Sequence, residues 1–376
     1  MKVCLVLGDF HKQGGISRYA AELAERFVKE HETHIITTNY RYKISNLIVH
    51  KKPMMPGRSW FLQRLFTIYY NTKYSSKVKN KFDIDIINQN GSESLSCDVV
   101  TMHSCHKAWV KEYKSWGPLQ YVRGSTNLSD RIVLPIEKRI LEKGSKKIIS
   151  VSEGVKREIL ENYNVSEEKI AVIPNGVDLE EFKPDSEKRI ETRSQYNIDE
   201  NDVVLLFTGY EFRRKGLEHI IRALPYTDKN TKLFAVGKSN PKPFQKLANE
   251  LGVSDNIIFT GFVPEIRDYY AASDIFVFPT AYEPFGLVIT EAMATGIPVI
   301  TSNLAGAAEL ITDWHDGLLL NDPNNANNIA EKINMLVEDE SLRKRMGQNA
   351  RKTAENYSWD RIARMTLEVY EEILNW

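Results

Sequence analysis

Short apolar runs alternate with amphipathic stretches through the first half of the chain. Six of these runs have the length and composition of buried strands: residues 2–7, 33–38, 84–88, 98–103, 146–151 and 169–173. Amphipathic helices are predicted from residue 16 and near 59–80, 129–143 and 153–162. Strands that alternate with helices form a parallel sheet that is covered on both faces. The pattern therefore predicts a doubly wound α/β domain.

A second series of the same kind follows a break in the pattern. The segment 182–196 carries Pro184 and a mixed-charge run, which is typical of a linker between domains. Beyond it, strands are predicted at residues 203–208, 231–236, 256–260, 275–278 and 298–301. The amphipathic stretch 359–376 is expected to pack back on the first domain. The sequence thus predicts two Rossmann-like domains, residues 1–185 and 186–358.

The composition narrows the class of protein. A length of 376 residues fits two domains, since a typical domain has about 100–200 residues. Cys4, Cys97 and Cys105 show no CxxC spacing, which disfavours a zinc or redox site and indicates a reducing compartment. The first apolar run is too short for a signal peptide, and no run approaches a membrane span. We therefore expect a cytoplasmic protein that does not cross a membrane.

The net charge of zero hides a separation of charge. Residues 1–185 contain 29 Lys and Arg against 22 Asp and Glu, and residues 33–82 contain ten basic residues and no acidic one. Within that stretch, residues 59–70 form a helix candidate with large aromatics and flanking cations, which suits an anionic membrane surface. A core helix with a solvated basic face explains the pattern almost as well. No recognition motif accompanies the charge, so a nucleic-acid partner is not expected.

The densest group of special residues lies at 282–298. A strand that ends near residue 278 delivers this loop to the carboxyl edge of the sheet, where ligands bind in open α/β folds. Backbone N–H groups from Phe285, Gly286 and Leu287 onward are expected at a helix N-terminus, where they can hold an anion such as a phosphate. Glu283 and Glu291 flank them. The helix dipole explains one such Glu about as well as a ligand does.

The segment EPFGLVITEAMATGIPV closely resembles the signature of the retaining nucleotide-sugar glycosyltransferases of family 4. Gly14-Gly15, the PNGVD run at 174–178 and Lys215-Gly216 agree with it, so the resemblance spans nearly the whole chain. It implies the GT-B fold, in which two Rossmann-like domains face a central cleft. It also implies transfer of a sugar from a nucleoside-diphosphate donor, most commonly UDP, to a glycan or lipid-linked acceptor in cell-envelope synthesis.

The resemblance implies no cofactor and no metal, because cations of the protein hold the diphosphate. Fixed cations stabilise a leaving diphosphate without reorganisation. Lys215 matches one of them. The family has an Arg directly after the strand glycine, here Gly209, but this chain has Tyr210 there. Either Arg213 or Arg214 must therefore take the second cationic role.

Further roles also follow from the resemblance. Glu291 is implied to bind the donor ribose, Glu283 the transferred sugar, and His103 is implied to hydrogen-bond that sugar. The remaining positions implied at the donor are Gly14, Gly15, Asn175, Gly209, Val263, Phe285, Gly286 and Leu287. Turn chemistry alone also explains the glycine pair and the Asn-Gly dipeptide.

Two other functions remain open from the sequence. A sugar-nucleotide epimerase has the same fold and donor, and a noncatalytic nucleotide-sugar-binding protein would keep the fold without the reaction. Paired carboxylates are also used by glycosidases, which the family resemblance disfavours. An NAD dehydrogenase is disfavoured more strongly, because no GxGxxG motif follows the first predicted strand of either domain.

Overall fold

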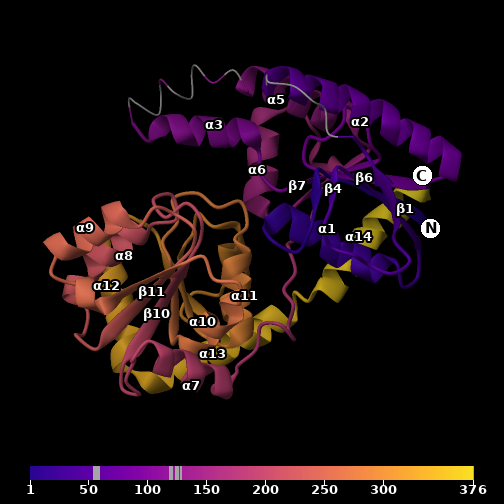
Figure 1. Cartoon of the computed structure of the whole chain (residues 1–376). Coiled ribbons are helices and arrows are strands. Elements are labelled where there is room, and N and C mark those ends of the chain that lie inside the picture. Colours follow the sequence, from indigo (N-terminus) through magenta and orange to yellow (C-terminus); the bar gives the residue numbers. More distant parts are fainter. Residues whose placement is uncertain (54–59, 118–121, 123–126, 128, 376) are drawn as a thin grey trace. The chain divides into compact units, whose positions relative to one another are not determined.

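The computed structural model describes residues 1–53, 60–117, 122, 127 and 129–375. In it the chain forms two compact units, which Figure 1 traces along the sequence. The first unit comprises Met1–Asn175 with Trp359–Trp376, and the second comprises Gly176–Ser358. Among the described residues, no helix combines the length and the apolar character that a membrane span requires.

The first unit contains a seven-stranded sheet in the order β5-β3-β1-β6-β7-β8-β9, with every pairing parallel. Its strands are β1 (Lys2–Val6), β3 (Glu32–Thr37), β5 (Ile48–Lys51), β6 (Ile86–Asn90), β7 (Val99–Met102), β8 (Lys147–Ser150) and β9 (Ile170–Val172). Beside it, β2 (Asp9–Phe10) pairs with β4 (Asn39–Tyr40). The strand order reverses between β1 and β6, which is where ligands bind in doubly wound sheets.

Helices cover both faces of this sheet. They are α1 (Gly15–Phe27), α2 (Trp60–Phe82), α3 (His106–Ser115), α5 (Asp130–Arg139) with its π-helical extension Ile140–Gly144, α6 (Glu153–Asn162) and α14 (Trp359–Leu374). Successive strand residues point to opposite faces. On β6, therefore, Ile87 packs with Val78 of α2, whereas Asn88 donates to Tyr370 Oη of α14 at 2.6 Å.

The second unit repeats the arrangement with a six-stranded parallel sheet in the order β12-β11-β10-β13-β14-β15. Its strands are β10 (Val203–Thr208), β11 (Thr231–Val236), β12 (Ile257–Gly261), β13 (Ile275–Phe278), β14 (Val299–Ser302) and β15 (Gly317–Leu320). One helical layer contains α8 (Leu217–Ala223), α9 (Lys242–Glu250) and α12 (Ala326–Glu338). The other contains α7 (Ser186–Gln195), α10 (Ile266–Ala272), α11 (Leu287–Thr295) and α13 (Glu340–Glu355).

The segment predicted as a linker is instead part of the second unit. Residues 186–195 form α7, which packs on α10, so the boundary lies at Asn175 and not at residue 185. The mixed charges of this segment bind it to the sheet. Arg189 Nη2 lies 2.6 Å from Asp274 Oδ1, and Arg193 Nη2 lies 2.5 Å from Asp274 Oδ2. Ion pairs with a residue about 80 positions away are not visible in a local sequence pattern.

Candidate active site

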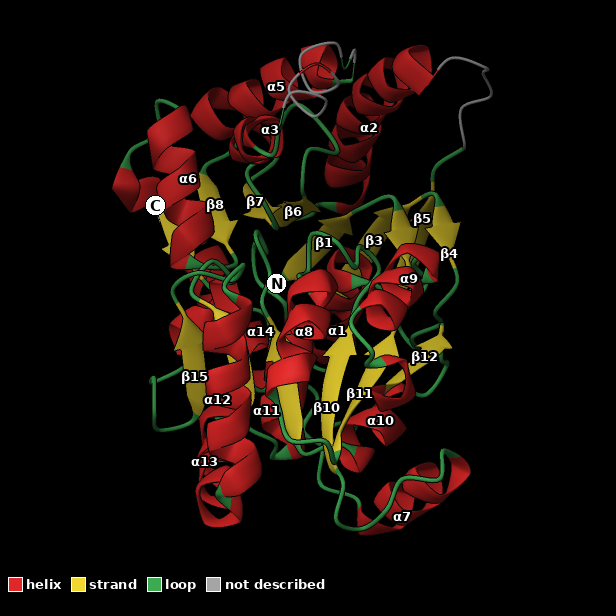
Figure 2. Cartoon of the chain, turned by 90° about the vertical axis from the view of Figure 1, so that its left-hand side faces the viewer, coloured by secondary structure: helices red, strands yellow, loops and turns green. Residues whose placement is uncertain are grey.

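The second unit brings two loops together at the reversal of its strand order. β10 and β13 are neighbours in the sheet, although three helices and two strands separate them in the sequence. Figure 2 shows β10 and β11 with the helices around them. Because the strands are parallel, the loop after β10 and the loop after β13 leave the sheet at the same edge. These are the loops that carry Lys215 and Glu283.

Two cations surround the carboxylate of Glu283. Lys215 Nζ lies 3.1 Å from Glu283 Oε2, and Arg214 Nη1 lies 3.4 Å from the same oxygen. Lys215 Nζ also lies 5.0 Å from the ring centroid of Phe278. The side chains of Arg214 and Lys215 are each 13% exposed and that of Glu283 is 15% exposed, so water screens these charges only partly. The sequence analysis expected Glu283, Lys215 and either Arg213 or Arg214 in one site, and the structure brings Lys215 and Arg214 into contact with Glu283.

Glycines allow this close packing. A Cβ on Gly209 would lie 2.4 Å from Lys215 Cδ, so the lysine side chain occupies the space that a larger residue would fill. Gly216 has φ of +85°, and a Cβ there would lie 2.0 Å from the carbonyl oxygen of Pro279. The loops after β10 and β13 are therefore in direct contact through backbone at Gly216.

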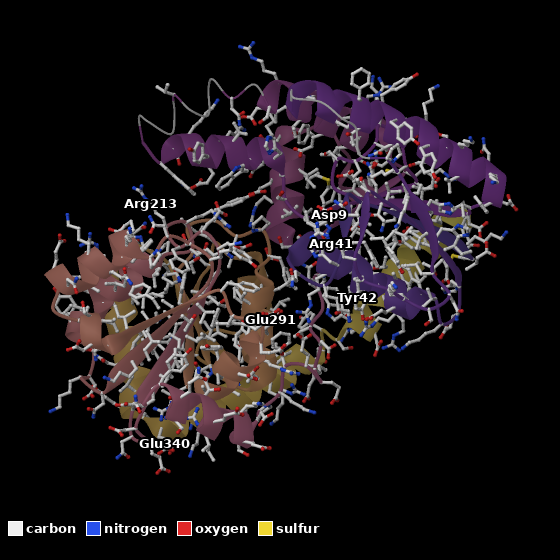
Figure 3. The ribbon with its side chains drawn as sticks, viewed as in Figure 1. Asp9, Arg41, Tyr42, Arg213, Glu291 and Glu340 are labelled. Atoms are coloured by element: carbon white, nitrogen blue, oxygen red, sulfur yellow. The ribbon has the colours of Figure 1, made fainter. Side chains whose placement is uncertain are left out.

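The structure distinguishes between Arg213 and Arg214, which the sequence left as alternatives for the second cation. Arg214 is mostly buried, and its Nη1 donates to the carbonyl oxygen of Tyr282, while Nη2 lies 2.7 Å from Glu211 Oε2. Arg213 is exposed at the periphery of the second unit, where Figure 3 labels it. Of the two, Arg214 is thus the one beside Glu283.

The loop of the signature motif is held from its other side by residues 305–307. Glu283 forms a parallel bridge with Ala305, and the N–H of Gly306 donates to Glu283 O at 2.8 Å. Gly286, with φ of +98°, directly precedes α11 as its N-cap, and the first N–H groups of that helix have no helical acceptor. Phe285 and Gly286 are buried and Leu287 is half-buried.

Glu291 lies at the middle of α11 and is only 8% exposed. Tyr270, from the neighbouring helix α10, lies with its hydroxyl 2.9 Å from Glu291 Oε2 and is itself fully buried. This hydroxyl fixes the orientation of the carboxylate. Val263 is placed at the same edge of the sheet, two residues after β12 ends, and is half-buried.

The other predicted residues belong to the first unit. His103 directly follows β7, and its Nε2 lies 3.2 Å from Asn90 Oδ1. The ring of Tyr19 meets it edge-on, with the centroids 5.0 Å apart. Burial lowers the pKa of His103 from 6.5 to about 4, so the ring is neutral at physiological pH. A neutral ring that donates from Nε2 to Asn90 keeps Nδ1 as a hydrogen-bond acceptor.

The lowered pKa of His103 predicts a pH-dependent stability. Because the unfolded chain binds the proton more tightly, the stabilisation is complete above pH 6.5 and is lost as the pH falls towards 4. Over this pH range the free energy of unfolding is expected to fall by up to about 3 kcal/mol because of His103, and the His103→Gln variant is expected to lack this fall. Chemical denaturation of both proteins, from about pH 7 down to about pH 4.5, measures the difference. Parallel pH curves for the two proteins would contradict it.

Gly14, Gly15 and Asn175 lie at the same edge of the first sheet as His103. Gly14 has φ of +80° and precedes α1, of which Gly15 is the first residue. Both glycines are exposed. Asn175 is 5% exposed, and its Oδ1 has no hydrogen-bond partner in the part of the chain that the structure describes.

Sequence reasoning missed a polar cluster beside these residues. Lys52 Nζ lies 3.2 Å from Glu93 Oε2, and Asn71 Nδ2 donates to the same oxygen at 3.3 Å. Asn39 Nδ2 donates to Oδ1 of Asp9, which Figure 3 labels in the first unit with Arg41 and Tyr42. Lys52 and Glu93 are 41 positions apart, and the strand before Lys52 was not predicted. The one signal in the sequence that could have indicated Lys52 and Glu93 is that each lies shortly after a strand.

Metal ligation finds no support in the geometry of the described residues, where no three His, Cys, Asp or Glu side chains are grouped closely enough to hold an ion.

Comparison with known proteins decides the family. Residues 13–181 match the model described as Glycosyltransferase Family 4, and residues 188–353 match the one described as Glycosyl transferases group 1. The chain belongs to the group 1 glycosyltransferases. The glycosyltransferase is 28% identical over 386 aligned positions to the uncharacterized glycosyltransferase MJ1607 of Methanocaldococcus jannaschii, covering 99% of this chain and 98% of the relative.

Solved structures place the glycosyltransferase in the GT-B fold. WaaG, a glycosyltransferase involved in lipopolysaccharide biosynthesis, superposes with a TM-score of 0.81 at 22% identity, covering 98% of this chain and 99% of WaaG. HepE from Anabaena, solved in complex with UDP, gives a TM-score of 0.78 at 20% identity, covering 99% of this chain and 100% of HepE. The predicted fold class and the family resemblance are both confirmed.

Proposed function

We propose that this glycosyltransferase moves a sugar from a UDP-sugar to a glycan or lipid-linked acceptor with retention of the anomeric configuration. The observation that carries the proposal is the cluster of Lys215 and Arg214 around Glu283 at the reversal of the second sheet. Two cations at this edge suit a diphosphate, and a carboxylate between them suits the hydroxyls of the adjacent sugar.

In the proposed reaction the bond between the anomeric carbon and the diphosphate oxygen breaks. The acceptor hydroxyl oxygen bonds to that carbon from the face that the diphosphate leaves, and the hydroxyl proton passes to a released phosphate oxygen. Lys215 and Arg214 stabilise the negative charge that develops on the leaving group. Glu283 orients the sugar, and neutral His103 offers it a hydrogen bond. The protein supplies these charges itself, so we propose that the reaction needs no metal and no cofactor.

Other residues of the second unit are proposed to make the remaining contacts with the donor. Glu291, oriented by Tyr270, is proposed to bind the ribose hydroxyls. The N–H groups of Gly286 and Leu287 at the start of α11 are proposed to bind a phosphate oxygen. The donor base is proposed to contact backbone groups around Val263. HepE, which shares the fold, has been solved with UDP, with UDP and glucose, and with UDP-glucose, which supports uridine as the base.

A binding experiment tests the donor. UDP at a hundred times its dissociation constant is expected to add about 2.7 kcal/mol to the free energy of unfolding, because it binds only the folded protein. Thermal shifts with UDP, GDP and ADP measure the selectivity. Glu291→Ala is expected to abolish the shift, whereas Glu338→Ala, which removes an exposed carboxylate from α12 of the same unit, is the control. A larger shift with GDP than with UDP would overturn the assignment of uridine.

Product analysis separates transfer from the alternatives. An epimerase would convert the nucleotide-sugar without any acceptor, and a noncatalytic binding protein would leave it unchanged under all conditions. A retaining transferase is expected to release UDP in proportion to the new glycoside and to keep the donor configuration. Proton NMR of the anomeric region, with and without acceptor, distinguishes these three outcomes.

The acceptor is proposed to bind the carboxyl edge of the first sheet. Asp9, Lys52 and Glu93 provide charged groups there that can hydrogen-bond several hydroxyls of a glycan. A role in cell-envelope synthesis is supported by WaaG, which shares the fold and is involved in lipopolysaccharide biosynthesis. We propose that the reaction takes place in the cytoplasm, with a nucleotide-sugar and a glycan or lipid-linked acceptor as partners and without a nucleic-acid partner.

We also propose that α2 attaches the protein peripherally to an anionic membrane. Its exposed face combines Phe66 and Tyr69, 56% and 62% exposed, with exposed Lys73 and Lys77. Residues 54–59 and the side chains of 60–65, which belong to the aromatic stretch in the sequence, lie outside the described residues. Lys73→Glu with Lys77→Glu is expected to abolish co-sedimentation with phosphatidylglycerol liposomes. Sedimentation that is independent of anionic lipid would contradict this attachment.

A further inference from the structure

A cavity of about 290 Å³ lies in the first unit at the amino edge of its sheet. Asp98, which lines it, directly precedes β7, whereas His103 directly follows that strand. The cavity is therefore at the opposite edge of the first sheet from His103. Its walls come from the end of α2, from the segment before β7 and from the turn after α5.

Positive charge exceeds negative charge around this cavity. Lys79, Lys143 and Lys146 line it together with a single acid, Asp98. Lys79 Nζ lies 2.5 Å from Asp98 Oδ2, and Lys146 Nζ lies 3.2 Å from Asp98 Oδ1. Asp98 thus fixes two ammonium groups, and each keeps further N–H donors for a ligand. Over the described part of the chain, Lys143 has no carboxylate within ion-pair distance.

A buried hydroxyl adds to these donors. Ser75 lines the cavity one helical turn before Lys79, on the same face of α2, and is 1% exposed. Its Oγ has no hydrogen-bond partner among the described residues. A buried hydroxyl without a partner is destabilising, and a bound acceptor would remove that cost. Phosphate oxygens are acceptors of this kind.

The backbone around the cavity is closely packed. The π-helical turn Ile140–Gly144 ends at a glycine whose Cβ would lie 2.5 Å from the carbonyl oxygen of Leu95. The N–H of Cys97 donates to Gly144 O at 2.8 Å. These contacts fix Lys143 and Lys146 relative to Asp98. π-helical turns of this kind occur frequently at functional sites.

We propose that this cavity binds a phosphate-type oxyanion, as the free ion, a phosphorylated metabolite or the phosphate of a lipid headgroup. Lysines near helix C-termini also complement the helix dipole, which explains Lys79 and Lys143. The dipole explains neither the cavity beside them nor the unpartnered hydroxyl of Ser75. The cavity is in the first unit, so its ligand is distinct from the donor diphosphate proposed at Lys215.

Calorimetric titration tests the site in a protein whose donor site is disabled. Inorganic phosphate and pyrophosphate are titrated into Lys215→Ala, so that binding at the cavity is measured apart from the donor site. Adding Lys143→Gln or Lys146→Gln is expected to weaken binding about tenfold, because each removes a charge-assisted hydrogen bond. Both lysines are exposed, so neither change affects the core. Lys29→Gln, exposed in the first unit and outside the cavity, is the control.

The source of the phosphate is decided by competition. Vesicles of phosphatidylcholine with phosphatidate are expected to displace pyrophosphate if the ligand is a headgroup, whereas vesicles of phosphatidylcholine alone are not. Absence of displacement assigns the site to a free anion. Equal binding by the lysine variants and the control, or no binding of either anion, would overturn the proposal. Neither result would bear on the binding of UDP, which is tested separately.

Discussion

Lys215→Ala is expected to lower kcat for sugar transfer by about a hundredfold to a thousandfold, the usual cost of removing a fixed group that stabilises transition-state charge. The side chain is 13% exposed and lies 3.1 Å from Glu283, in a position that Gly209 keeps open. In the alanine variant, water can replace the lost positive charge only by entering the space beside Gly209 that the lysine side chain fills. The rate of nucleoside diphosphate release under saturating donor and acceptor measures the effect.

The neighbouring arginine provides a matched control for this change. Arg213→Ala removes one positive charge from the same loop, but from an exposed position, so we expect less than about a fivefold effect. Lys215→Arg is expected to be nearly as slow as Lys215→Ala, because a guanidinium does not fit beside Gly209 and over Phe278. Full activity in Lys215→Ala, with the fold unchanged by circular dichroism, would exclude the proposed role.

The interior strands of both sheets could be predicted from the sequence because their residues are almost all buried and apolar. β10, β11 and β13 agree with the prediction to the residue. The edge strands β5 and β15 were missed. β5 is short and partly exposed, and β15 begins at Gly317, so neither shows a long apolar run. Helix α7 was missed because it is polar and buries only two residues.

From the sequence, only those residues of the candidate site that belong to a recognisable motif could be predicted. The motif and the glycine after Lys215 identified Glu283, Glu291 and Lys215, but the choice between Arg213 and Arg214 depends on the backbone path of a loop. The pair of Lys52 and Glu93 depends on tertiary structure, because the strand before Lys52, β5, pairs with β3, while the strand before Glu93, β6, pairs with β1. Charge pairs that are distant in sequence leave no local pattern.

Gly216→Ala is expected to lower the free energy of unfolding of the second unit by about 3 kcal/mol or more. Two costs add at this position. An alanine at φ of +85° is strained by about 1–2 kcal/mol, and its Cβ would lie 2.0 Å from the carbonyl oxygen of Pro279. That oxygen belongs to backbone directly after β13, so it cannot move away without displacing the loop that carries Glu283.

Gly252→Ala separates the two costs, because Gly252 has φ of +70° but no atom within 4 Å of its Cβ position. We expect this variant to lose only about 1 kcal/mol, the cost of the backbone conformation alone. Urea denaturation of both variants, followed by fluorescence, gives the comparison. Equal losses would mean that the Pro279 backbone yields freely, and the contact at Gly216 would then not hold Lys215 and Glu283 in register. A much larger loss in Gly216→Ala would show that this backbone contact fixes the spacing of the two loops.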